Sequence, residues 1–115
     1  MGKCRENKRK AHLTGRLATV ARVEDLPKGR GGRVKLRDGS QVALFNVKGE
    51  FYAIENFCPH KGLPLANSRV HGHKVECEHH GWRFDLRDGR CLKKRKCSVE
   101  SYEVLVEDGW IKIKV

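Results

Sequence analysis

The chain contains the sequence Cys58-Pro59-His60-Lys61-Gly62 and, with sixteen residues between His60 and Cys77, the sequence Cys77-Glu78-His79-His80-Gly81. Each stretch offers one thiolate and at least one imidazole within four residues, so a single tight loop could supply two metal ligands. A glycine closes each stretch and allows the backbone to turn sharply. Two such loops facing each other would provide four ligands.

These four ligands fit two kinds of metal centre. Two cysteines and two histidines suit a tetrahedral zinc ion. Zinc loops, however, usually pair cysteine with cysteine and histidine with histidine, whereas each loop here supplies one of each. Mixed loops suit a two-iron cluster in which one iron binds both thiolates and the other binds both imidazoles. The residues alone leave both kinds of centre open.

Outside residues 57–82 the sequence predicts antiparallel β structure. Short runs of alternating apolar residues are separated by X-Gly turn signals, and no long stretch has helical periodicity. The expected strands are residues 17–23, 33–36, 41–47, 50–56, 83–86, 91–92, 102–106 and 110–115, with a flexible loop at 29–32. We therefore predict an all-β domain. Residues 57–82 break this pattern, so function is expected there.

Positive charge is concentrated at the start of the chain. The sequence has 25 Lys and Arg against 14 Asp and Glu, a net charge of +11, and residues 1–35 hold 11 of the basic residues. We expect residues 1–15 to form a mobile basic arm and residues 16–115 to form one domain. Three explanations of the charge stay open: a solvated surface, ranked first, an acidic protein partner, and nucleic acid, ranked last because no nucleic-acid-binding signature accompanies it.

Cellular location is predicted from what the sequence lacks. No apolar run approaches the ~18 residues of a membrane span, and none has the form of a signal peptide. The five cysteines are an odd number, so a disulfide framework is disfavoured and Cys91 and Cys97 are expected to be free thiols. These observations favour a cytoplasmic protein.

The two cysteine–histidine stretches resemble the cluster loops of Rieske 2Fe-2S proteins, whose ligand pattern is matched by Cys58-x-His60 and Cys77-x-x-His80. The similarity continues through residues 58–65, 80–91, 102–104 and 108–113, and covers about residues 16–115. The resemblance implies an antiparallel, multi-sheet fold with a small cluster-binding subdomain at about residues 57–90.

The resemblance also implies a role for individual residues. Cys58 and Cys77 would bind one iron and His60 and His80 the other, in one 2Fe-2S cluster per chain. Around these ligands the matching loops place six further residues, which are Gly62, Leu63, His79, Gly81, Trp82 and Phe84.

Four of these six depart from the respiratory members of the family. Leu63 and His79 occupy the positions of a disulfide, which therefore cannot form. Trp82 replaces a serine and Phe84 a tyrosine, so two hydrogen-bond donors to the cluster are missing. We predict a reduction potential below about +100 mV, toward the lower end of the Rieske range.

The function implied is one-electron transfer. A Rieske-type ferredoxin would carry electrons from a reductase to a terminal oxygenase or similar enzyme. The chain is too short to hold an oxygenase iron site as well, so it is expected to be an oxidoreductase component rather than a stand-alone enzyme. One alternative is a small Rieske subunit of a larger oxidoreductase such as nitrite reductase. The other, from a different class, is a zinc-stabilised basic binding module.

Overall fold

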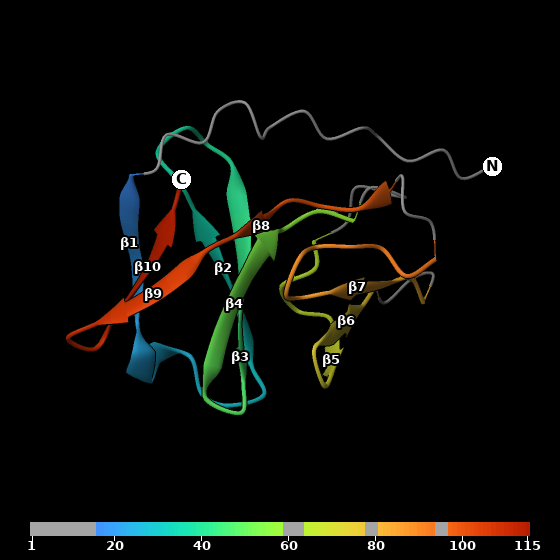
Figure 1. The fold of residues 1–115 in the computed structure, drawn as a ribbon, viewed down its shortest axis with the longest axis horizontal. Coiled ribbons are helices and arrows are strands. Elements are labelled where there is room, and N and C mark those ends of the chain that lie inside the picture. The colour runs from blue at the N-terminus through green and yellow to red at the C-terminus, as the bar shows by residue number, and fades with distance from the viewer. Residues whose placement is uncertain (1–15, 59–63, 78–80, 94–96) are drawn as a thin grey trace.

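Short antiparallel strands make up most of the computed structural model, which describes residues 16–58, 64–77, 81–93 and 97–115 (Figure 1). The first sheet has the order β1 (Leu17–Arg22), β10 (Trp110–Lys114) and β9 (Val104–Glu107); the second has β2 (Gly31–Lys35), β3 (Gln41–Val47), β4 (Glu50–Glu55) and β8 (Ser101–Tyr102); and the third has β5 (Arg69–His71), β6 (Lys74–Glu76) and β7 (Arg83–Asp85). One 3-10 turn, η2 (Val23–Asp25), follows β1. The predicted all-β, multi-sheet fold is confirmed.

Two of the predicted hairpins have two-residue turns with a left-handed backbone. Lys48 and Gly49 join β3 to β4 with φ angles of +53° and +94°, and Asp108 and Gly109 join β9 to β10 with φ angles of +50° and +80°. Turns of this hand match the twist of the strands they connect, which is why an X-Gly pair is such a strong hairpin signal.

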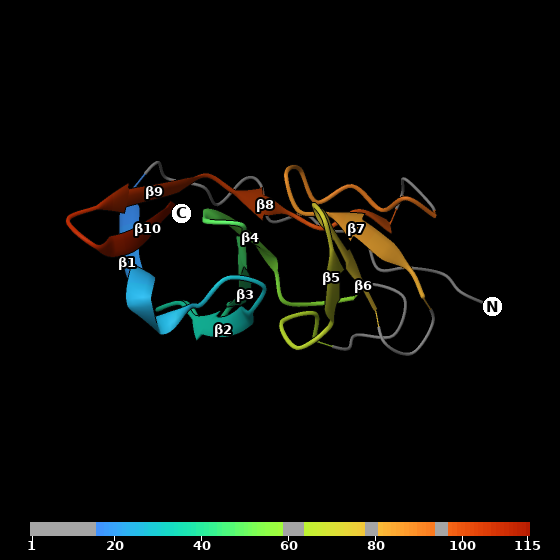
Figure 2. The same ribbon diagram turned by 90° about the horizontal axis from the view of Figure 1, so that it is seen from below.

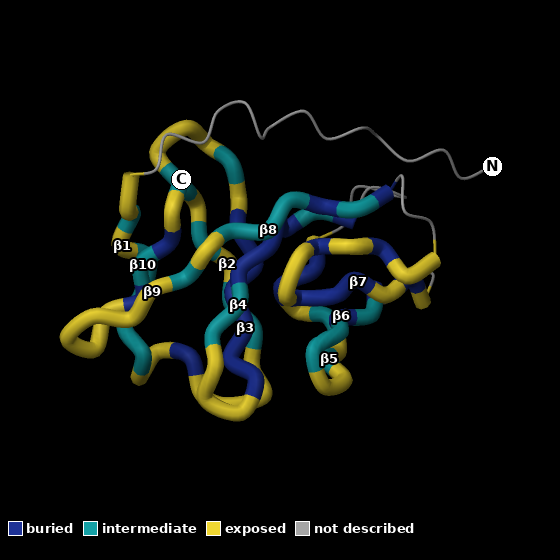
Figure 3. The backbone as a smooth tube through the Cα atoms, viewed as in Figure 1, coloured by how far each residue is buried: buried dark blue, intermediate teal, exposed yellow. Residues whose placement is uncertain are grey.

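Strand β3 is buried on both faces because it lies between two apolar cores (Figure 3). One face packs with the first sheet, in a core formed by Leu26, Val42, Leu44, Ala53, Ile111 and Ile113. The other face packs with the third sheet, in a core that includes Ala43, Phe45, Val47, Ile54, Val75, Phe84 and Leu86. Both views of the ribbon show the third sheet lying apart from the first, on the far side of the second (Figure 2).

The structure corrects two sequence-based expectations. Gly31 and Gly32, expected in a flexible loop, belong to β2, where a Cβ on Gly31 would lie 2.4 Å from the backbone oxygen of Ala66. Glycine is required here by close backbone approach rather than by flexibility. The hairpin of β5 and β6 was not predicted, since three-residue strands give too little alternation to recognise.

Candidate metal centre

The second cysteine–histidine stretch is held in a hairpin of the third sheet. Cys77 directly follows β6, and Trp82 directly precedes β7. The backbone nitrogen of Cys77 donates to the oxygen of Trp82 at 2.7 Å, and that of Gly81 donates to the oxygen of Cys77 at 2.9 Å. Gly81 has a φ angle of +67°, which glycine adopts without steric cost. This geometry fixes both described ends of the loop.

The first stretch begins just after β4, so the two predicted ligand loops come from different sheets. Cys58 and Cys77 are nevertheless in the same apolar core, with exposed fractions of 0% and 1%. Both are thiols rather than disulfides. The structure thus buries the two predicted thiolate ligands, which come from separate loops, in one apolar core.

The donor set fits the implied cofactor. Thiolates are the usual ligands of iron–sulfur clusters, and a dry, apolar surrounding is one of the features that set a cluster's potential. Trp82 and Phe84 lie in the same core as the cysteines, with exposed fractions of 6% and 0%. Neither carries a hydroxyl group, and the low reduction potential inferred from this stays a prediction.

Five of the predicted site residues lie outside the described residues and stay predictions. They are the ligands His60 and His80 and their neighbours Gly62, Leu63 and His79.

Of the other cysteines, Cys91 is a thiol, as expected. Cys97 is disulfide-bonded, so the expectation of a free thiol is wrong for this residue.

His71 is the last residue of β5, and His73 lies in the turn that leads to β6. Both were expected to be exposed. His71 is exposed, and its Nε2 lies 3.9 Å from a carboxylate oxygen of Glu76. His73 is half-buried, and its ring meets that of Tyr52 edge-on at 5.5 Å. The His73 contact therefore joins the third sheet to β4.

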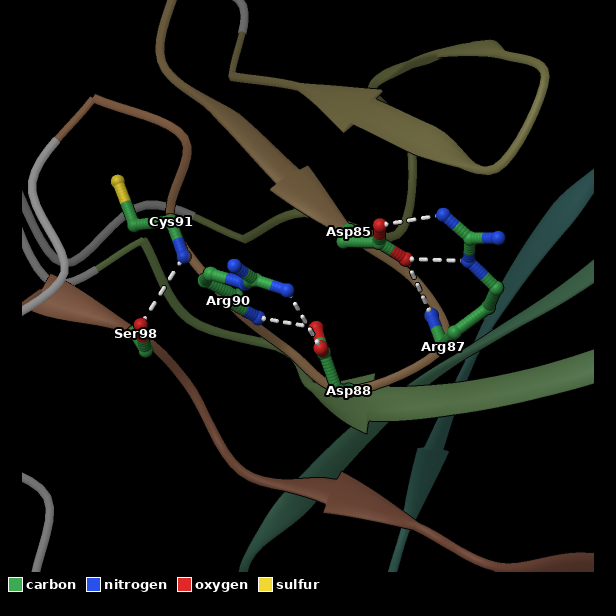
Figure 4. A network of polar contacts seen from close by, with 6 residues as sticks. All are labelled: Asp85, Arg87, Asp88, Arg90, Cys91 and Ser98. Carbon is green, nitrogen blue, oxygen red and sulfur yellow. Dashed lines mark hydrogen bonds and ion pairs between the residues drawn. The ribbon is translucent and has the colours of Figure 1, made fainter.

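A polar network that the sequence did not reveal braces the turn after β7 (Figure 4). Asp85 accepts hydrogen bonds from the backbone nitrogen of Arg87 at 2.9 Å and from its side chain at 3.0 and 2.8 Å. These bonds hold the pKa of Asp85 at about 2, well below its usual value of 3.8. The carboxylate therefore keeps its charge although the residue is nearly buried.

Further along the same turn, Asp88 accepts from the backbone of Arg90 at 2.9 Å, and the backbone of Cys91 donates to the Ser98 hydroxyl at 3.0 Å. Gly89, which lies between Asp88 and Arg90 in the chain, has a φ angle of +78°, and a Cβ there would lie 2.0 Å from the backbone oxygen of Val99. The turn is thus tied to the segment leading into β8.

No helix in the described part of the chain combines the length and the apolar character needed to cross a bilayer.

Comparison with known proteins places the cysteine-bearing loops in a family context. The Rieske [2Fe-2S] domain family matches residues 16–103. This match covers most of the chain and includes both cysteine–histidine stretches.

Two ferredoxins of oxygenase systems are similar to the chain. It is 35% identical over 101 residues to the ferredoxin component of the p-cumate 2,3-dioxygenase system of Pseudomonas putida, and the match covers 86% of each chain. It is 30% identical over 105 residues to the ferredoxin component of the naphthalene 1,2-dioxygenase/salicylate 5-hydroxylase systems of a Ralstonia species, covering 90% of this chain and 99% of that one.

One solved structure comes from a different kind of system. A protein described as the small subunit of an NADH-dependent nitrite reductase from Mycobacterium tuberculosis is 33% identical to the chain, with a TM-score of 0.81. The match covers 87% of this chain and 95% of that chain.

Proposed function

Because the chain belongs to the Rieske [2Fe-2S] domain family, we propose that it is a one-electron carrier that takes electrons from a reductase and delivers them to a terminal oxygenase or similar enzyme. The observation that carries this proposal is that two thiols from different loops, those of Cys58 and Cys77, are buried in the same apolar core. The cluster of this family accepts and releases one electron when bound.

The chain's own residues would hold the cluster and tune it. Cys58 and Cys77 are proposed as the thiolate ligands of one iron, and His60 and His80 as the imidazole ligands of the other. Neutral imidazoles donate less negative charge than thiolates, so two histidines raise the potential above that of a four-thiolate cluster. Trp82 and Phe84 are buried in the same core as the two cysteines and would help to exclude water from the cluster.

We also propose that residues 16–115 form the Rieske domain, with a cluster-binding subdomain at about 57–90 and a basic arm at 1–15. The family match ends at residue 103, but β10, at residues 110–114, pairs with β1 along most of its length. The last strand thus completes the first sheet, which supports a boundary near the end of the chain. A cytoplasmic location is proposed from the similarity to ferredoxin components of oxygenase systems, and the disulfide at Cys97 is the observation against it.

The redox partners are proposed to present acidic surfaces. Strand β2 and its flanks carry five exposed basic residues and no Asp or Glu between residues 26 and 37; the five are Lys28, Arg30, Arg33, Lys35 and Arg37. An unbalanced basic surface of this kind speeds the approach of an acidic partner.

A second candidate function is supported by the similarity to a nitrite reductase small subunit. In that case the chain would pass electrons within a permanent complex. Size-exclusion chromatography of native extracts separates the two: a free carrier elutes near 13.2 kDa, whereas a subunit elutes with a much larger enzyme.

The cluster is tested by purification without air and with ample iron. We expect iron, acid-labile sulfide, visible absorbance and, after reduction, the electron spin resonance signal of a Rieske centre. Cys58→Ser and Cys77→Ser should each abolish that signal, while Cys91→Ser, which alters another buried thiol of the same core, should keep it. A colourless protein that contains zinc and no sulfide would support the binding-module alternative instead.

A further inference from the structure

Asn56 is a nearly buried polar residue that directly follows β4 and lies two positions before Cys58. Its side-chain oxygen accepts hydrogen bonds from the backbone nitrogens of Leu65 and Ala66, both at 2.8 Å. Leu65 and Ala66 are buried in the same core as Cys58. A single oxygen atom therefore ties the chain just before Cys58 to the chain seven residues after it.

The orientation of this amide is set from its other side. The Asn56 side-chain nitrogen donates to the side-chain oxygen of Gln41 at 3.2 Å, and its backbone nitrogen donates to the backbone oxygen of Gln41 at 3.0 Å. Two backbone N–H groups require an acceptor, so Oδ1 and not Nδ2 faces Leu65 and Ala66. Gln41 is the first residue of β3, so the contact is braced against the second sheet.

A second contact fixes the same point from another direction. The backbone oxygen of Ala66 closely approaches Gly31 on β2, where a Cβ would lie only 2.4 Å away. Residues 65 and 66 are thus held between β2 and Asn56. In the hairpin that carries Cys77, the link is made by the backbone itself: backbone hydrogen bonds join Cys77 to Trp82 and to Gly81.

We propose that Asn56 is a positioning residue for the metal centre: it keeps Cys58 at a fixed spacing from Leu65 and Ala66, and so holds the first thiolate ready for the cluster. This inference rests on the proposed function. Residues that orient metal ligands typically change metal affinity by about 10–100-fold when they are altered.

The test compares Asn56→Leu, which keeps the number and branching of the side-chain heavy atoms but removes the acceptor, with Asn46→Leu as a matched control. Asn46 is equally buried, with an exposed fraction of 6% against 7%. Its side-chain nitrogen donates to the backbone oxygen of Leu26 at 2.7 Å, and its side-chain oxygen accepts from the backbone nitrogen of Gly49 at 2.8 Å. Both substitutions leave buried polar groups without partners, so both should lower the midpoint of unfolding.

Only Asn56→Leu should alter the centre itself. For the holoprotein we expect the rate of cluster loss to a chelator to rise about tenfold or more, with shifted g values in the spin resonance spectrum. Asn46→Leu should keep the wild-type spectrum and rate of loss at temperatures below its unfolding midpoint. Asn56→Asp retains the acceptor oxygens, so it should restore the rate of loss, while its added charge lowers the reduction potential.

Equal rates of loss in Asn56→Leu and Asn46→Leu, or a wild-type spectrum in Asn56→Leu, would overturn the proposal. If Asn56→Leu yields no holoprotein, Gln41→Leu takes its place, because it alters an exposed residue and removes only the acceptor for the Asn56 nitrogen. A smaller rise in cluster loss is then expected, and a wild-type rate overturns the inference. Wild-type protein without iron and sulfide would instead end the proposed function.

Discussion

Phe84 is fully buried in the core that contains Cys58 and Cys77, the two proposed cluster ligands, at a position where the respiratory members of the family have tyrosine. The reduced cluster carries one more negative charge than the oxidised cluster, so hydrogen-bond donors near its sulfurs favour reduction. A phenylalanine supplies no donor. This residue-level difference is the basis for expecting a potential below about +100 mV.

Phe84→Tyr should therefore raise the reduction potential. A new hydrogen bond of about 1 kcal/mol to the reduced state corresponds to roughly 40 mV for one electron. The measurement is a redox titration followed by visible circular dichroism. Phe45→Tyr adds the same hydroxyl to another fully buried phenylalanine of this core and serves as the control. An equal shift in both variants would show that the effect is not specific to residue 84.

The Asp85–Arg87 pair makes folding sensitive to acid. Because the pKa of Asp85 is lowered from 3.8 to about 2 in the folded chain, the stabilisation is complete above about pH 4 and is lost as the pH falls toward 2. Arg87 is half exposed, with 57% of its side chain accessible, so solvent screens the pair. We estimate a contribution of roughly 1 kcal/mol from the Asp85 carboxylate.

Arg87→Gln should thus lower the free energy of unfolding at pH 6 by roughly 1 kcal/mol and flatten its decline between about pH 4 and pH 2.5. Urea unfolding across this range measures both effects. Arg90→Gln breaks an ion pair whose two side chains are both about half exposed, so it should leave the acid response unchanged. An unaltered slope in Arg87→Gln would contradict the assignment.

Among the elements, the hairpins were the most predictable from sequence and the third sheet the least. Turn pairs such as Lys48-Gly49 and Asp108-Gly109 need a positive φ angle, which favours glycine, so the glycine in the local sequence marks the turn. Strands β5 and β6 are three residues long, and their burial depends on packing against the distant β3 and β4. Such contacts leave no periodic trace in the sequence.

The turn between β3 and β4 offers a stabilising substitution. Lys48 adopts a φ angle of +53°, which is costly for most residues with a side chain but is tolerated by asparagine. Lys48→Asn should raise the free energy of unfolding by about 0.5 kcal/mol, seen as a higher midpoint in thermal or urea unfolding. Lys28→Asn removes the same charge at a residue without a left-handed backbone and should give no such gain.

At the scale of the molecule, the cysteine–histidine spacing predicted the family and the two thiols but not the supports around them. Cys58 and Cys77 have a recognisable spacing, whereas Asn56 and Gly31 act through contacts made only after folding. The shared role of β3, buried on both faces, was likewise hidden, because a strand covered on both sides has no alternation to read. Sequence thus predicts ligands more readily than the residues that position them.

The placement of charge is also a property of the whole molecule. Arg33 and Lys35 alternate along β2 with Val34, which packs toward the core shared with the first sheet. They therefore lie on the same face of the second sheet as Gly31, whose neighbour is Ala66 beside the first ligand loop. A positive field on this side would attract an anionic reactant toward the cluster, and it would do so most strongly at low salt.

Charge reversal tests this field with ferricyanide, a small anionic oxidant, as the probe. Arg33→Glu combined with Lys35→Glu should slow oxidation of the reduced protein about tenfold at low ionic strength and much less at 1 M salt, where the Debye length is about 3 Å. Lys112→Glu combined with Lys114→Glu makes the same change in net charge on β10, in the first sheet, away from the third sheet (Figure 1). Because this control pair is remote, it should slow the reaction far less. Equal slowing by both pairs would mean that overall charge, and not the β2 surface, guides the approach of a negatively charged partner.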